Sequence, residues 1–169
     1  MENIFRKEFV DQCLITIDEN TVKIKSCLQE LDEKDIWFRN NAHINSVGNI
    51  LLHLCGNIRQ YIISSLGGEP DIRERDLEFS TTGGFTKIAL AAKWQDTIQE
   101  AKMIISHASS ENLLRRRVVQ GTSYSGVGII IHVTEHYSYH TGQIIFLTKL
   151  FKNIDMGFYA GKDLNQRNA

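Results

Sequence analysis

The chain has 169 residues, of which 42% are hydrophobic and 23% are charged, and its formal net charge is −1. This length predicts one domain, residues 1–169, that is large enough to bury its own core. The near-neutral charge excludes a global basic field of the kind that attracts nucleic acid or an anionic membrane, so neither partner is expected.

The cysteines and the N-terminus predict where the protein resides. Cys13, Cys27 and Cys55 are widely spaced and lie in apolar helical patterns, which is typical of reduced core thiols. The N-terminus lacks the apolar segment of a signal peptide, and no apolar run reaches about 18 residues. We therefore expect a cytoplasmic protein.

Two long helices are predicted in the first part of the chain. Apolar residues at steps of three and four predict a helix over residues 5–31. After a polar connection, Asn45 or Ser46 provides the N-cap of a second helix, which ends near Leu66. Two glycines and the single proline, within residues 67–70, stop this helix.

The middle of the chain is less regular. Residues 67–84 carry charge and glycine but no sustained apolar period, which predicts a long surface connection. Long connections in compact domains are often functional. A third helix is predicted over residues 86–109, and residues 117–120 are expected to be extended before Gly121.

The last regular element is a helix over residues 126–152, and the tail 153–169 has little periodicity. Since strand signals are almost absent, the predicted class is all-α, most simply a four-helix bundle with its core in residues 5–152. Metal sites in bundles are built from side chains on facing helices.

The predicted last helix carries His132, His136 and His140 at four-residue intervals. Two imidazoles one turn apart share a face and can bind one ion, but residues eight apart are separated by about 12 Å along the axis. At about 100° per residue, the apolar stripe is centred near His140, with His136 about 45° and His132 about 85° away. The inward pair is His136 and His140, either as metal ligands or as hydrogen-bonded core residues.

A catalytic zinc-type site usually has a third protein ligand and one open position. His43 lies in a connection and His107 near a helix end, where solvated histidines are common. His53 lies within the second helix, and its depth matches that of the pair if the two helices run parallel. Cys55 points about 200° away from His53, so the two cannot serve one ion. A carboxylate is the remaining alternative.

Residues 132–136 also match H-x-x-E-H, a metalloprotease pattern. Such a protease requires a glutamate ligand further downstream, and no glutamate follows Glu135. Glu135 itself lies about 145° from the centre of the apolar stripe, so we expect it to face solvent. The protease interpretation is therefore rejected.

Three segments resemble the DinB/YfiT-like superfamily. They are residues 52–61 (LHLCGNIRQY), 67–71 (GGEPD) and 135–144 (EHYSYHTGQI). Members of this superfamily are four-helix bundles, often homodimers, with a metal held by one histidine of the second helix and an HxxxH pair of the last. The resemblance implies His53, His136 and His140 as ligands, with His132 as an addition to the pattern.

The resemblance also implies chemistry. Relatives include thiol-dependent transferases and isomerases, and others are described as metal-dependent hydrolases. Three neutral imidazoles and an open position suit a divalent transition metal, zinc or nickel first, acting as a Lewis acid. A low-molecular-weight thiol is a candidate second cofactor. The alternative is a non-catalytic bundle that binds a small ligand or serves as a structural dimer.

Further residues are candidates for the surroundings of this site. One group could orient the imidazoles or line a pocket, although ordinary core packing and amide hydrogen bonding explain it equally well. It comprises Asn57, His132, Tyr137 and Gln143. A second group could bind an anionic substrate or thiol, with solvated surface charge as the competing explanation. It comprises Arg59, Arg73 and Arg75.

Overall fold

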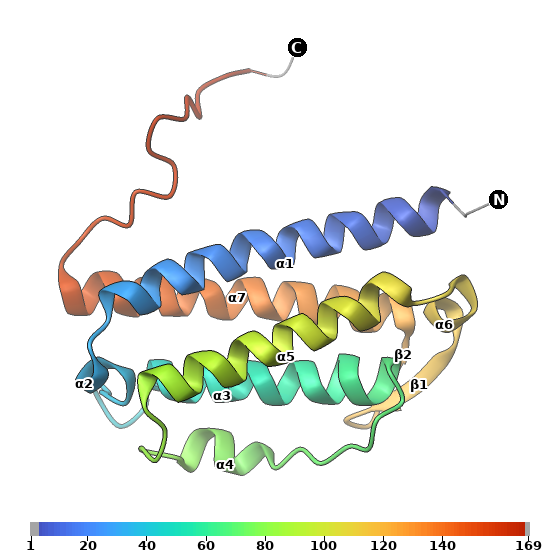
Figure 1. Ribbon diagram of the computed structural model, residues 1–169, viewed down its shortest axis with the longest axis horizontal. Coiled ribbons are helices and arrows are strands. Elements are labelled where there is room, and N and C mark those ends of the chain that lie inside the picture. The colour runs from blue at the N-terminus through green and yellow to red at the C-terminus, as the bar shows by residue number, and fades with distance from the viewer. Residues whose placement is uncertain (1–3, 168–169) are drawn as a thin grey trace.

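The computed structural model describes residues 4–167 and is built mainly from helices (Figure 1). Its four long helical segments are α1 (Ile4–Glu30), α3 (Val47–Ile58) continued by the wider π-helical turns of η1 (Arg59–Leu66), α5 (Lys87–His107) and α7 (Gly126–Lys152). The shorter elements are α2 (Glu33–Ile36), α4 (Arg75–Ser80), α6 (Ser110–Leu114), β1 (Arg116–Val119) and β2 (Thr122–Ser125). The predicted all-α four-helix bundle is confirmed.

Serine side chains begin the two helices that carry the histidines. Ser46 is the N-cap of α3, and its hydroxyl accepts a hydrogen bond from the backbone N–H of Asn49. Ser125 does the same for Gly128 at the start of α7. Each cap satisfies a backbone donor that the first helical turn leaves without an intrahelical partner, so both helices start at defined residues.

The long helices α3 and α7 pack together in antiparallel orientation (Figure 1). His53 of α3 meets His136 of α7, whereas Asn57, farther along α3, meets the earlier residue His132. The parallel arrangement considered for the depth comparison is therefore wrong. Counted from the η1 end at Leu66, His53 lies about 20 Å deep, which matches the depth of the α7 pair at least as well.

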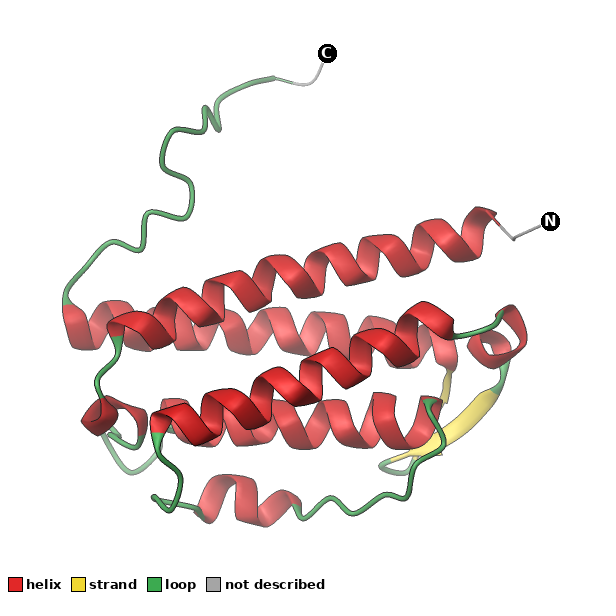
Figure 2. Ribbon diagram, viewed as in Figure 1, coloured by secondary structure: helices red, strands yellow, loops and turns green. Residues whose placement is uncertain are grey.

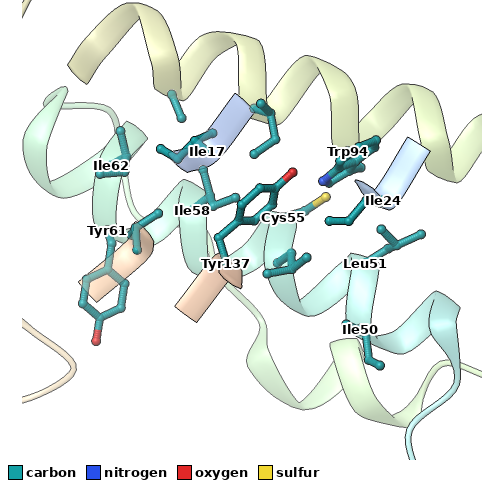
Figure 3. Packing of buried hydrophobic residues seen from close by; sticks show 14 of the residues in the cluster. Ile17, Ile24, Ile50, Leu51, Cys55, Ile58, Tyr61, Ile62, Trp94 and Tyr137 are labelled. Atoms are coloured by element: carbon teal, nitrogen blue, oxygen red, sulfur yellow. The ribbon is translucent and has the colours of Figure 1, made fainter. Parts of the chain in front are cut away.

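Apolar side chains from all four long helical segments fill the core (Figure 3). Trp94 of α5 and Tyr137 of α7 are the largest of the fully buried side chains. Cys27 and Cys55 are buried and unpaired, as expected for reduced core thiols. Full burial of a large apolar side chain such as leucine, isoleucine or phenylalanine stabilises a fold by about 1.5–3 kcal/mol.

The connection predicted over residues 67–84 is wrong in one respect, because it contains the helix α4. We call residues 67–86 the strap, since they cross the outer side of α3 before α5 begins (Figure 1). Within α4 only Glu78 is buried, so this helix presents no apolar stripe to the core. Hydrophobic periodicity could not reveal a helix that polar contacts attach to its neighbour.

A second unexpected element is the small hairpin before α7, seen as the only strands in the described part of the chain (Figure 2). Three residues of the extended segment predicted at 117–120 belong to β1, which pairs antiparallel with β2, and the fourth, Gln120, lies in the turn instead. Gln120 and Gly121 connect them with positive φ angles of 49° and 77°, as a tight hairpin turn requires. The polar sequence of β2 (TSYS) lacks the apolar alternation that would have predicted it.

After α7 the chain forms no helix or strand up to residue 167, in keeping with the aperiodic tail. Met156 and Phe158 nevertheless pack against the core. Within residues 4–167, no helix is long and apolar enough to cross a membrane.

Candidate metal centre

Three histidines from two helices meet between α3 and α7. His53 comes from α3, and His136 and His140 come from successive turns of α7. The Nε2 atom of His136 lies 3.0 Å from Nε2 of His53 and 3.2 Å from Nε2 of His140. His53 and His140 are buried, and His136 is partly exposed. The three side chains thus direct one nitrogen each toward a common point.

The Nδ1 atom of His53 is hydrogen-bonded to the Glu78 carboxylate of α4, at 2.8 Å from Oε2. Because a carboxylate oxygen only accepts, this nitrogen must be the donor. A neutral imidazole carries a single N–H, so Nε2 of His53 keeps its lone pair and faces the other two histidines. Such carboxylate–histidine pairs commonly orient metal-binding imidazoles.

Glu78 is itself held by Arg73. The guanidinium donates from Nε to Oε1 at 2.7 Å and from Nη2 to Oε2 at 2.9 Å, a bidentate ion pair that is almost inaccessible to solvent. Burial alone would raise the pKa of Glu78, but the hydrogen bonds from Arg73 and His53 lower it below its ordinary value. The carboxylate is therefore ionised, as its role as acceptor requires.

His140 is oriented by a residue of its own helix. Its Nδ1 lies 2.7 Å from Oε1 of Gln143, one turn along α7, and the amide oxygen accepts the N–H. This again leaves the Nε2 lone pair directed at the cluster. Gln143 therefore lies beside a candidate ligand, and its role there stays a prediction.

His136 lies in the middle of the three and differs from the others. Burial, followed by the charges of His140 and His53, lowers the pKa of His136 to about 3. Burial also lowers the pKa of His140. The Nδ1 atom of His136 is buried and has no hydrogen-bond partner among the described residues. Burial thus favours the neutral form of His136 and His140, and His136 is the member of the group whose second ring nitrogen is left without a partner in the described part of the chain.

The donor set fits a metal ion. In a tetrahedral site with bonds of 2.0–2.1 Å, neighbouring nitrogen ligands are about 3.3–3.4 Å apart. The observed nitrogen separations of 3.0 and 3.2 Å are close to that spacing. One ligand atom from each of His53, His136 and His140 lies within 4.8 Å of the others, so this three-histidine group could hold a metal ion.

His132 lies outside the group, in a contact of its own. Its ring stacks on Tyr61 of η1 with the centroids 4.2 Å apart, and its Nε2 lies 3.3 Å from the Asn57 amide nitrogen. Its ring also stacks on His136 at 5.6 Å. Asn57 and His132 thus lie beside the cluster, as expected for residues of its surroundings, and the Oδ1 atom of Asn57 has no partner among the described residues.

Tyr137 is not brought to the cluster. Its side chain points into the core near Cys55 and Trp94 (Figure 3), and its hydroxyl lies 3.0 Å from Thr21 of α1. Core packing, the competing explanation given above, is what the structure shows for this residue. Cys55 is likewise in the core, where burial raises the pKa of its thiol to about 11.

The three arginines considered for anion binding have different surroundings. Arg73 is committed to Glu78, and its Nη1 donates to Gln60 at 2.9 Å. Arg59 lies 3.6 Å from Glu100, and the Arg75 guanidinium lies over the ring of Phe79 at 4.9 Å. Arg59 and Arg75 remain candidates for contact with an anion, whereas Arg73 is already neutralised by a buried carboxylate.

Two of the histidines outside the cluster, and the glutamate of the protease pattern, lie at the surface. His43 and His107 are exposed. Glu135 is exposed as well, as expected from its helical phase. The carboxylate that the structure does place at the cluster, Glu78, was missed because it lies in a strap without periodicity. Gly56, one turn after His53, was the one available sign that something approaches α3 closely there.

The fold and the cluster together define a DinB-like helical bundle with a three-histidine group between its second and last long helices. Residues 5–159 match the family described as "Protein of unknown function (DUF1572)", and the chain belongs to this family. The chain is also similar in structure to a DinB-like protein from Bacillus subtilis, with a TM-score of 0.62 over 85% of this chain and 91% of that chain, at 12% sequence identity. No curated protein matches the sequence.

Proposed function

We propose that the protein binds one divalent transition metal ion, zinc or nickel, through Nε2 of His53, His136 and His140. The observation that supports this is the orientation of two imidazoles. Nδ1 of His53 is bound to Glu78 and Nδ1 of His140 to Gln143, so two Nε2 lone pairs point at the Nε2 atom of His136. A cation among the three Nε2 atoms would accept both of these lone pairs, and that of His136 once its single N–H lies on Nδ1, the nitrogen without a hydrogen-bond partner among the described residues.

We further propose that the bound ion serves catalysis. With three neutral ligands, a divalent ion retains its full charge and can activate a water molecule or a thiol as a nucleophile near neutral pH. The reaction is then a thiol-dependent transfer or a hydrolysis, the two classes that the DinB-like resemblance implies. A low-molecular-weight thiol would be the second cofactor in the first case.

A pocket beside His140 supports a small-molecule substrate. It has a volume of about 460 Å³ and lies between α7 and the loop that leads into α3, with Tyr139, Gln143 and Phe146 on its α7 side. Gln143 bonds to His140, and the ring of Tyr139 contacts His140 edge-on at 4.9 Å. A ligand in this pocket would be largely apolar, with polar groups near Gln143.

A second candidate function is binding without turnover. Among the described residues, the carboxylate hydrogen-bonded to a cluster histidine is Glu78, and Arg73 occupies it. This carboxylate is therefore not free to act as a general base. A bundle that binds a ligand without turnover needs no general base, so the observation fits this alternative. The enzyme would instead rely on the metal ion to activate the nucleophile.

Metal analysis of protein purified without an affinity tag tests the proposal first. We expect about one equivalent of zinc or nickel after supplementation, and less than about 0.2 equivalents would overturn it. Thiol-conjugation and ester-hydrolysis assays then compare wild type with His136→Ala. Turnover that disappears in the variant supports the enzyme, and metal binding without turnover in either assay supports the binding function.

A further inference from the structure

The strap is fastened to one face of α3 at both of its ends. At the end of α4, the buried Asn49 side chain donates from Nδ2 to the backbone oxygens of Glu78, at 2.9 Å, and Thr81, at 2.7 Å. Arg39 adds a hydrogen bond to the Phe79 oxygen at 2.7 Å and another to Oδ1 of Asn49 at 2.8 Å. These contacts satisfy carbonyls that the end of a short helix leaves free.

The start of the strap is fastened through Gln60. The amide oxygen of Gln60 accepts from Arg73 at 2.9 Å, and its nitrogen donates to Asp71 at 2.8 Å. Asp71 in turn accepts from the backbone N–H of Arg73 at 3.1 Å. Arg73 is thereby fixed in the orientation in which it binds Glu78.

Between these two ends, the carboxylate of Glu78 passes over Gly56. A Cβ atom at position 56 would lie 1.8 Å from Oε1 of Glu78 and 2.7 Å from its Cδ. Any other residue would push the carboxylate away from the helix, and with it the hydrogen bond to His53. Gly56 is in a helical segment, where glycine is less favourable than alanine, so its presence needs a reason of this kind.

The residues of α3 and η1 that receive the strap form one stripe. They are Asn49, His53, Gly56 and Gln60, at steps of four, three and four. This spacing places them on a single helical face. Each contacts the strap in a different way. Asn49 holds the end of α4 and His53 binds the Glu78 carboxylate. Gly56 leaves room for that carboxylate, and Gln60 fixes Arg73.

We propose that Glu78 is a positioning residue of the metal centre, placed by the strap so that His53 presents its Nε2 to the ion, and that Gly56 is required for this placement. The inference rests on the proposed metal binding. Its structural part, the orientation of His53 by Glu78, can also be measured in protein that has no metal.

Three variants isolate the role of Glu78. Glu78→Gln removes the charge but keeps the shape, Gly56→Ala keeps the carboxylate but displaces it, and Glu74→Gln makes the same chemical change at an exposed position of the strap. Loss of a partner that orients a metal ligand typically weakens metal binding about 10–100-fold. We expect a loss of this size in the first two variants and none in Glu74→Gln.

Competition with a chromophoric chelator gives the affinity, and the visible spectrum of the cobalt-substituted protein reports the ligand geometry. A merely structural role of Glu78 would lower the melting temperature without changing the spectrum. Equal metal affinities of wild type, Glu78→Gln and Gly56→Ala would overturn the proposal.

Long-range 15N–1H correlation spectra of metal-free protein provide the second readout. In wild type and Glu74→Gln we expect His53 as the Nδ1–H tautomer, and in Glu78→Gln and Gly56→Ala a mixture with the Nε2–H tautomer. If the protein binds no metal, the proposed function fails while these spectra still decide the role of Glu78. An Nε2–H tautomer of His53 in wild type would refute that role.

Discussion

The two sides of α3 are built on different principles. The side toward α7 joins two long helices whose apolar stripes carry the three histidines, and this pattern is visible in the sequence. A neighbouring side receives the strap, where Glu78, Arg73 and Asn49 form buried polar contacts without a hydrophobic stripe, and His53 contacts both sides. The ligands of the candidate centre thus come from the periodic side, and the groups that orient one of them come from the aperiodic side.

The largest expected effect falls on the α7 side. His136→Ala removes the central nitrogen of the cluster, and two remaining imidazoles make a weak site. We expect the metal content to fall from about one equivalent to below about 0.2 equivalents. Elemental analysis after gel filtration measures this. His132→Ala is the matched control on the same helix face and should retain the ion, so loss of metal there would contradict the division of roles.

The next effect tests the strap side through its ion pair. Arg73→Ala leaves the Glu78 carboxylate buried without its bidentate partner, and breaking such a pair typically destabilises a protein by about 3–5 kcal/mol. Urea denaturation of metal-free protein measures the change in the free energy of unfolding. The exposed Arg75→Ala should change it by less than about 0.5 kcal/mol. A similarly small effect at Arg73 would show that the strap is not held as described.

A smaller effect is expected where Asn49 holds the end of α4. Asn49→Ala leaves buried carbonyls of Glu78 and Thr81 without a donor, which should cost about 1–3 kcal/mol. We expect the substitution to accelerate amide hydrogen exchange more in residues 75–81 than in α7. Equal acceleration in both regions would indicate that strap and bundle open together rather than separately.

The smallest effect concerns Tyr137, which lies in the core and not at the histidines. Tyr137→Phe removes one hydrogen bond to Thr21 and should cost about 1 kcal/mol with no change in metal affinity. Thermal denaturation and chelator competition measure the two quantities. A drop in metal affinity would restore Tyr137 to the site.

Much of the fold followed from hydrophobic spacing. The segment 126–152 is predicted with the same bounds as α7 because its apolar residues repeat over many turns. In the structure this helix begins after the N-cap Ser125 and ends at Asn153, which has a left-handed backbone conformation. The inward pair of histidines followed from the same phase. The prediction of His53 as the third ligand depended on the resemblance to DinB-like proteins, since residue spacing left several candidates for that ligand.

The parts that escaped prediction share a physical cause. Glu78 lies 25 residues from His53 along the chain, and their contact depends on hydrogen bonds rather than on apolar burial. The antiparallel orientation of α3 and α7 was equally hidden, because both orientations bring the histidines to similar depths. The expected homodimer, cytoplasmic location and thiol cofactor stay predictions.

The most direct test of the central claim is a crystal structure of the metal-loaded protein with anomalous data collected at the absorption edge of the metal. We predict one peak about 2.0–2.1 Å from Nε2 of His53, His136 and His140, with Nδ1 of His53 still bound to Glu78. A peak elsewhere, or coordination of the ion by His132 in place of one of these three, would contradict the account.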